Sequence, residues 1–84
     1  MTCEVILQPG AERDFRRLPP DIQRRIREKL LGLEAQPRPH GSLKLAKVGG
    51  YRIRVGDYRI LYDVDDGKRR VIVLGIGHRR EIYR

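Results

Sequence analysis

The stretch Tyr51-Arg52-Ile53-Arg54-Val55-Gly56-Asp57-Tyr58-Arg59-Ile60-Leu61-Tyr62 decides the fold of this chain. Over most of its length apolar residues alternate with basic or polar ones, the period of two that is typical of β-strands. Gly56 can occupy the first central position of a two-residue type II′ turn, which requires glycine there. The stretch therefore predicts an antiparallel hairpin in which Val55 pairs with Tyr58 and Arg54 pairs with Arg59.

A second hairpin follows at Asp65-Asp66-Gly67-Lys68, where Asp-Gly is a favoured turn pair, and leads into a strand over residues 69–76. If both loops are two residues long, one face of the sheet is apolar and carries Tyr51, Ile53, Val55, Tyr58, Ile60, Tyr62, Val64, Val71 and Val73. The other face then carries Arg52, Arg54, Arg59, Leu61, Asp63, Ile72, Leu74, Ile76 and His78. A slip of one residue would move a strand's side chains to the wrong face.

The first half of the chain predicts a strand and two helices. Residues 3–8 alternate like a short strand that Pro9-Gly10 closes, and residues 11–18 form a short helix. Pro19-Pro20 ends that helix and begins another, whose apolar stripe is Ile22, Ile26, Leu30 and Leu33. We expect one α+β domain over residues 1–84: an N-terminal strand, an αα-hairpin, and a three- to four-stranded antiparallel sheet with the helices packed on one face.

Charge points to an anionic partner for the second half. The 84 residues include 19 Lys and Arg against 11 Asp and Glu, a net charge of +8. Residues 1–37 carry 7 basic and 6 acidic side chains, whereas residues 38–84 carry 12 and 5. Nucleic acid or an acidic protein fits this asymmetry.

The cysteine count and the hydropathy of the sequence bear on disulfides, metal sites and the expected cellular location. Cys3 is the single cysteine, so no disulfide can form within the chain and no cysteine-based metal site is indicated. No basic segment followed by an apolar run begins the sequence, and no apolar stretch is long enough to span a membrane. We therefore expect a cytoplasmic protein without a membrane partner.

The three arginines of the polar face are open to two interpretations. Like charges directly across two strands repel, so a face that keeps Arg52, Arg54 and Arg59 together fits an anion-binding site. A solvated basic face is the alternative. The C-terminal segment favours the first interpretation, because His78, Arg79 and Tyr83 follow the strand that neighbours these arginines.

The stretch 51–62 and the segment Ile76-Gly77-His78-Arg79-Arg80-Glu81-Ile82-Tyr83 together resemble the signature of the RelE branch of the RelE/ParE toxin superfamily. The order of strand, two helices and antiparallel strands fits as well. The resemblance implies a toxin of a type II toxin–antitoxin pair that cuts messenger RNA in the ribosomal A site. It also implies an acidic antitoxin partner, attack by the ribose 2′-OH, and no metal or cofactor.

Carried over by position, the resemblance matches the family's site to Arg52, Arg54, Arg59, Arg79 and Tyr83. We expect the catalytic residues to be Arg59, Arg79, Tyr83 and His78, and the RNA-binding residues to be Arg52, Arg54, Lys44 and Lys47. Familiar members have lysines where this chain has Arg52 and Arg54, and arginine effectively never loses its proton. The general base is therefore Tyr83 or His78. Two other functions stay open: a ParE-like inhibitor of DNA gyrase, and a nucleic-acid-binding module without catalysis.

Overall fold

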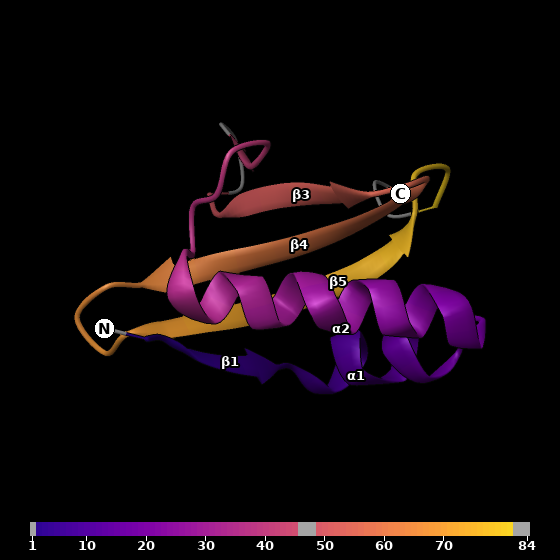
Figure 1. Ribbon diagram of the computed structural model, residues 1–84, viewed down its shortest axis with the longest axis horizontal. Helices are drawn as coiled ribbons and strands as arrows, with labels where there is room; N and C mark the ends of the chain where they lie inside the picture. The colour runs from indigo at the N-terminus through magenta and orange to yellow at the C-terminus, as the bar shows by residue number, and fades with distance from the viewer. Residues whose placement is uncertain (1, 46–48, 82–84) are drawn as a thin grey trace.

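The computed structural model describes residues 2–45 and 49–81, which form two helices and a five-stranded sheet. The chain runs through β1 (Glu4–Leu7), α1 (Pro9–Arg16), α2 (Pro20–Ala35), β2 (Leu43–Lys44), β3 (Tyr51–Val55), β4 (Tyr58–Asp65) and β5 (Arg70–His78). The strand order across the sheet is β1-β5-β4-β3-β2 (Figure 1). The predicted α+β class is confirmed: the N-terminal strand and four antiparallel strands form one five-stranded sheet.

The N-terminal strand, β1, lies parallel to β5 at one edge, with Val5 opposite Val71. The other neighbouring strands are antiparallel. Two parallel strands must be joined by a long crossover connection. The connection from β1 to the rest of the sheet contains α1 and α2. The N-terminal strand therefore belongs to the same sheet as the C-terminal strands.

Both helices begin at prolines, whose missing N–H costs nothing in a first turn. The first helix covers residues 9–16 rather than the predicted 11–18. The apolar stripe of α2 faces the sheet as expected, with Ile26 and Leu33 fully buried. The core lies between the helices and one face of the sheet, and it consists of Ala11, Ile26, Leu30, Leu33, Ile53, Val55, Ile60, Tyr62, Val71, Val73 and Ile76.

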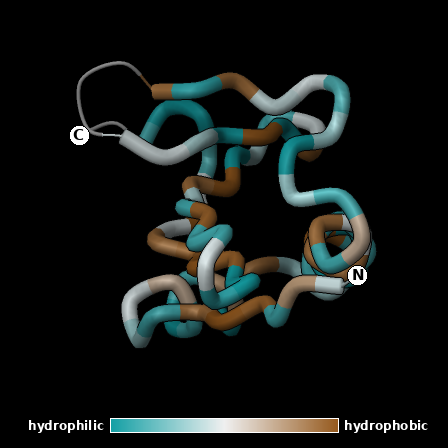
Figure 2. The backbone as a smooth tube through the Cα atoms, turned by 90° about the vertical axis from the view of Figure 1, so that its left-hand side faces the viewer, coloured by the Kyte–Doolittle hydropathy of each residue, from teal (hydrophilic) through white to brown (hydrophobic). Residues whose placement is uncertain are grey.

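The opposite face of the sheet carries no helix within the described ranges; we call it the open face. Figure 2 looks along α2, which lies to one side of the strands, while hydrophobic and hydrophilic residues alternate along the chain. Ile6 and Leu74 are more than a third exposed on the open face.

Within the described residues no helix is long and apolar enough to cross a membrane.

The first hairpin has the predicted register. Val55 pairs with Tyr58, Arg54 with Arg59, and Ile53 with Ile60. Gly56 has φ +59°, the left-handed value that its turn position requires. The Arg25 side chain reaches this turn from α2, because a Cβ built on Gly56 would be 3.1 Å from the Arg25 guanidinium.

The second hairpin differs from the prediction. Asp65 pairs with Arg70 instead of Lys68, so the loop spans residues 66–69, and Arg69 takes the positive φ of +54°. Two contacts explain the longer loop. The Asp65 carboxylate accepts a hydrogen bond from the Lys68 N–H at 3.1 Å, and Arg38 binds Asp66 with two hydrogen bonds of 3.0 and 2.8 Å.

A β-bulge then changes the face of the last strand. Leu61 pairs with Gly75, but the next residue, Tyr62, pairs with Val73, which leaves Leu74 as an extra residue in β5. The extra residue reverses the alternation beyond it. Ile76 and His78 therefore lie on the helix-covered face, and the prediction that they share the arginine face was wrong.

Candidate functional site

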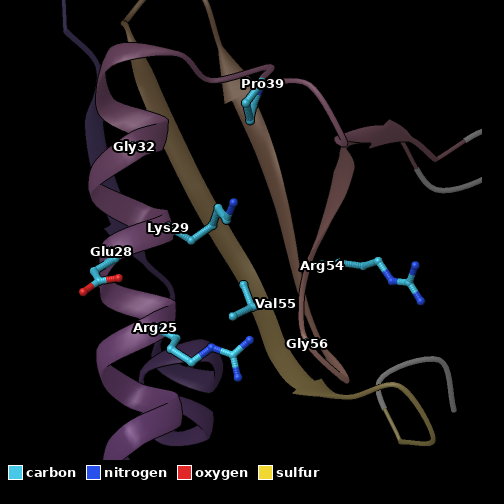
Figure 3. A pocket seen from close by; sticks show the side chains of 8 residues that line it. All are labelled: Arg25, Glu28, Lys29, Gly32, Pro39, Arg54, Val55 and Gly56. Carbon is cyan, nitrogen blue, oxygen red and sulfur yellow. The ribbon is translucent and has the colours of Figure 1, made fainter.

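The open face gathers three arginines beside a leucine. Arg54 and Arg59 are cross-strand partners, and Arg52 lies two residues before Arg54 on β3. Together with Gly41 and Leu43 they line a pocket of about 380 Å³, which we call the arginine pocket. In Figure 3 the Arg54 side chain points away from α2, whereas Val55 next to it points toward the helix.

Arg59 is buried within this pocket. Its residue surface is only 6% exposed, and it is the buried charged residue among the described positions. Nη1 donates to the carbonyl oxygens of Tyr58 at 3.1 Å and Gly56 at 3.4 Å. The buried Nε has no acceptor within the described part of the chain. A buried charged donor without an acceptor costs stability.

His78, the last residue of β5, was expected beside these arginines, but the structure places it on the opposite face of the sheet. The His78 ring meets the Tyr58 ring edge to face on the helix-covered side, with centroids 5.5 Å apart. His78 lines a different pocket, of about 360 Å³, together with Asp14, Arg17 and Glu81. Its Nδ1 accepts a hydrogen bond from the Arg80 N–H at 3.2 Å, which places the proton of the neutral ring on Nε2.

Arg79 begins the turn after β5. Its backbone N–H donates to the Asp57 carbonyl at 2.8 Å, which joins this turn to the Gly56-Asp57 turn of the first hairpin. The Arg79 side chain is exposed. The site residues expected at Lys47 and Tyr83 lie outside the described residues.

Lys44 is placed differently from the arginines. It pairs with Tyr51, whose ring packs toward the core, whereas its neighbour Leu43 pairs with Arg52 on the open face. Paired residues project to the same side of a sheet, so alternation directs Lys44 away from the arginine pocket. Leu43 occupies the position on that face. Sequence reasoning missed Leu43, because a two-residue strand has too few residues to reveal its alternation.

Asp14 of α1 is a second residue that the sequence did not single out. Its Oδ2 accepts a hydrogen bond from the Ile76 N–H at 3.2 Å, directly after the β5 bulge. Beyond Val73 the strand β5 has no β1 neighbour on that side, and α1 lies beside it. Asp14 thus satisfies a backbone donor that the bulge removes from the ladder.

A larger hollow, of about 450 Å³, lies on the other side of β3. Figure 3 shows it between α2 and the first hairpin, with Lys29 and Arg25 extending from the helix toward the strands and Glu28 pointing away. Arg54 touches its border but points away from its centre. No group of three His, Cys, Asp or Glu side chains within the described ranges is placed to hold a metal ion.

Three comparisons identify the family. Residues 5–83 match the model of the family described as ParE toxin of type II toxin–antitoxin system, parDE. The chain is 38% identical over 86 residues to Toxin RelG of Mycobacterium tuberculosis, covering 100% of this chain and 99% of that protein.

Solved structures agree with the sequence comparisons. The toxin–antitoxin complex RelBE2 of Mycobacterium tuberculosis contains a chain with TM-score 0.83 and 30% identity, covering 93% of this chain and 99% of that one. The archaeal RelE–RelB complex of Pyrococcus horikoshii gives a TM-score of 0.81 at 28% identity, covering 96% and 99%. The chain is a member of the RelE/ParE family, the toxins of type II toxin–antitoxin systems.

Proposed function

We propose that this toxin is an endoribonuclease that cleaves messenger RNA in the ribosomal A site. The observation that carries the proposal is the arginine pocket, in which the buried Arg59 keeps an unsatisfied Nε donor next to Arg54 on the neighbouring strand. Guanidinium groups bind phosphate through parallel N–H donors, which suits a phosphodiester at this position.

The reaction is an in-line attack of a ribose 2′-OH on the adjacent phosphate. The bond from the 2′ oxygen to phosphorus forms, the bond to the 5′ oxygen of the next nucleotide breaks, and the products carry a 2′,3′-cyclic phosphate and a 5′-hydroxyl. Negative charge develops on the phosphorane oxygens. Fixed donors aimed at that charge are the main contribution of a protein, and losing one costs about a hundred- to a thousandfold in rate.

We assign the phosphorane contacts to Arg59 and Arg79, and the flanking phosphates to Arg52 and Arg54. Arg59 is suited to a fixed role, since its side chain is buried and held at Nη1 by two carbonyls. The Arg79 backbone is itself bonded to Asp57, in the turn of the hairpin that carries Arg54 and Arg59.

The general base is assigned to Tyr83. His78 was the other candidate, but it lies across the sheet from the arginine pocket. Neighbouring cations lower a tyrosine pKa from its usual value of about 10, because they stabilise the phenolate. Tyr83→Phe should therefore abolish most cleavage, whereas His78→Gln should retain it; the reverse result would return the role to His78.

We also propose that an acidic antitoxin binds this chain. Twelve basic against 5 acidic side chains in residues 38–84 favour a carboxylate-rich partner, and a disordered segment could wrap this surface as it folds. The related toxins of Mycobacterium tuberculosis and Pyrococcus horikoshii were solved as complexes with antitoxins. Co-expression with the neighbouring small reading frame should yield a complex that copurifies and is inactive on ribosomes.

Inhibition of DNA gyrase is the second candidate, because the matching family model is named for ParE. One experiment separates the two. Purified toxin is added to programmed ribosomes and, separately, to gyrase with plasmid DNA, and the RNA 3′ ends are tested for the cyclic phosphate. Cyclic ends with normal supercoiling support the proposal; gyrase poisoning with intact RNA contradicts it. Salt-sensitive RNA binding without cleavage would identify a binding module instead.

A further inference from the structure

Leu43 is an exposed leucine inside a cationic pocket. Its residue surface is 52% exposed, and it lines the arginine pocket together with Arg52, Arg54 and Arg59. Single exposed leucines are common on protein surfaces and need no explanation by themselves. Leu43 differs because it lines the same pocket as Arg59, which is more than nine-tenths buried and has a donor without an acceptor.

The backbone holds Leu43 on this face. β2 pairs with β3 so that Leu43 is opposite Arg52, and the Leu45 N–H donates to the Gly50 carbonyl at 2.9 Å in the same connection. Gly50 has φ +78°, and a Cβ built there would lie 2.7 Å from the Tyr62 carbonyl oxygen, so the chain passes close over β4 at this point. Leu43 is thereby fixed beside the arginines rather than free to fold onto the core.

The lining of the arginine pocket is apolar at Leu43 and cationic at the arginines. This combination matches a nucleotide, which has a base and sugar at one end and a charged phosphate at the other. Ligand pockets combine apolar lining with a few polar groups that fix orientation, and about 380 Å³ lies within their usual range of about 300–1,000 Å³. The phosphate would satisfy the guanidinium donors, and the sugar and base would cover the leucine. Neither an inorganic anion nor a carboxylate side chain alone would bury that apolar surface.

We propose that the arginine pocket binds a single nucleotide of the RNA, with the reacting phosphate on Arg59, the flanking phosphate on Arg54, and the base or ribose packed against Leu43. This inference rests on the proposed function and makes Leu43 a substrate-positioning residue. Because a leucine makes no hydrogen bonds, its contact accepts every base. The nucleotide on Leu43 is therefore held without sequence readout, as apolar and stacking contacts to single strands usually are.

Binding in the absence of the ribosome tests the pocket separately from the reaction. The probes are a 2′-O-methyl RNA trinucleotide, which cannot be cleaved, and inorganic phosphate, each titrated against the purified toxin at fixed low salt. Leu43→Ala should lower the affinity for the trinucleotide about five- to tenfold, the equivalent of about 40–50 Å² of lost apolar contact. It should leave the affinity for phosphate unchanged. Arg54→Thr should weaken both probes.

Leu31 provides the matched control. It is also an exposed leucine, 57% exposed, but it lies on α2 outside the arginine pocket, so Leu31→Ala should change neither titration. Leu43→Met keeps an apolar side chain and should restore trinucleotide binding, which separates a direct contact from damage to β2. Unfolding midpoints of the three leucine variants, Leu43→Ala, Leu43→Met and Leu31→Ala, should agree with the wild type.

The proposal would be overturned if Leu43→Ala bound the trinucleotide with the same affinity as the wild type. It would also be overturned if Leu43→Ala lost equal affinity for the trinucleotide and for phosphate. A wild-type toxin that bound the trinucleotide no better than phosphate would be the third contradicting result. Failure of the proposed function looks different. There the trinucleotide would bind with the expected dependence on Leu43, while messenger RNA on the ribosome stayed intact.

Discussion

Arg54 and Arg59 are direct cross-strand partners between β3 and β4, one exposed and the other 6% exposed. Two cations at this spacing repel each other, and the partial burial of the pair limits the screening by solvent. A protein selected for stability alone would place an acid or a threonine at one of the two positions. The repulsion within the pair is therefore the cost that the proposed anion-binding site would impose on the fold.

Replacing Arg54 with threonine should separate stability from activity. Removing the repulsion should raise the free energy of unfolding by a few tenths to about 1 kcal/mol, while cleavage falls. Denaturant unfolding and ribosome-dependent cleavage measure the two effects. Arg70→Thr is the matched control, because Arg70 lies opposite Asp65 and 3.5 Å from Glu4, and its loss should lower stability slightly. A loss of stability in both variants would contradict the account.

The hydrogen bond from the Ile76 N–H to Asp14 should hold the β5 bulge. Asp14→Ala leaves that partly buried donor without an acceptor and should cost about 1–3 kcal/mol. Asp14→Asn keeps a carbonyl oxygen at the same place and should cost less than half as much. Amide hydrogen exchange at Ile76 reports on the bond directly. Equal losses in the two variants would show that the charge of Asp14 matters rather than the hydrogen bond.

The buried Tyr62 should make stability depend on alkaline pH. Burial raises the pKa of its hydroxyl, which donates to the Pro37 carbonyl at 2.8 Å. Its folded pKa therefore lies above the unfolded value of about 10. The contribution of Tyr62 is complete below about pH 10 and is lost as pH rises toward the folded pKa. Compared with wild type, Tyr62→Phe should lose less stability between pH 9 and pH 11 in denaturant unfolding; parallel curves would refute the assignment.

The sequence predicted those parts of the fold that local pattern controls. Glycine at position 56 and the alternation around it define the first hairpin completely, so Arg54 and Arg59 were correctly paired. The stripe of α2 was equally clear, because Ile26 and Leu33 recur at helical spacing and are buried. These features need only neighbours in the chain.

Long-range contacts caused the errors. The Asp66-Gly67 pair favours a two-residue turn, but Arg38, 28 positions away, holds Asp66 in a longer loop. The bulge of β5 is supported by Asp14, 62 positions from Ile76. Its local signal is Gly75, because a glycine inside a strand often marks a bulge, but that signal does not fix which face the following residues take. The consequence of the bulge is large, since one extra residue moved His78 from the predicted arginine face to the helix-covered face.

The candidate site was predictable in its charges and not in its shape. Alternation alone brings Arg52, Arg54 and Arg59 together, and the structure agrees. The position of Leu43 in the pocket depends on β2, whose two residues give no periodic signal. A pocket that combines cations with an apolar wall therefore becomes visible only in three dimensions.

The most direct test of the central claim is primer extension on a defined messenger RNA, with and without programmed 70S ribosomes. Wild-type toxin, Arg79→Ala and Arg59→Ala are compared at equal concentration, after their folding is verified by circular dichroism. The account predicts cuts within the A-site codon that require both the ribosome and the two arginines. Intact RNA in every lane, or the same cuts with both variants, would contradict it.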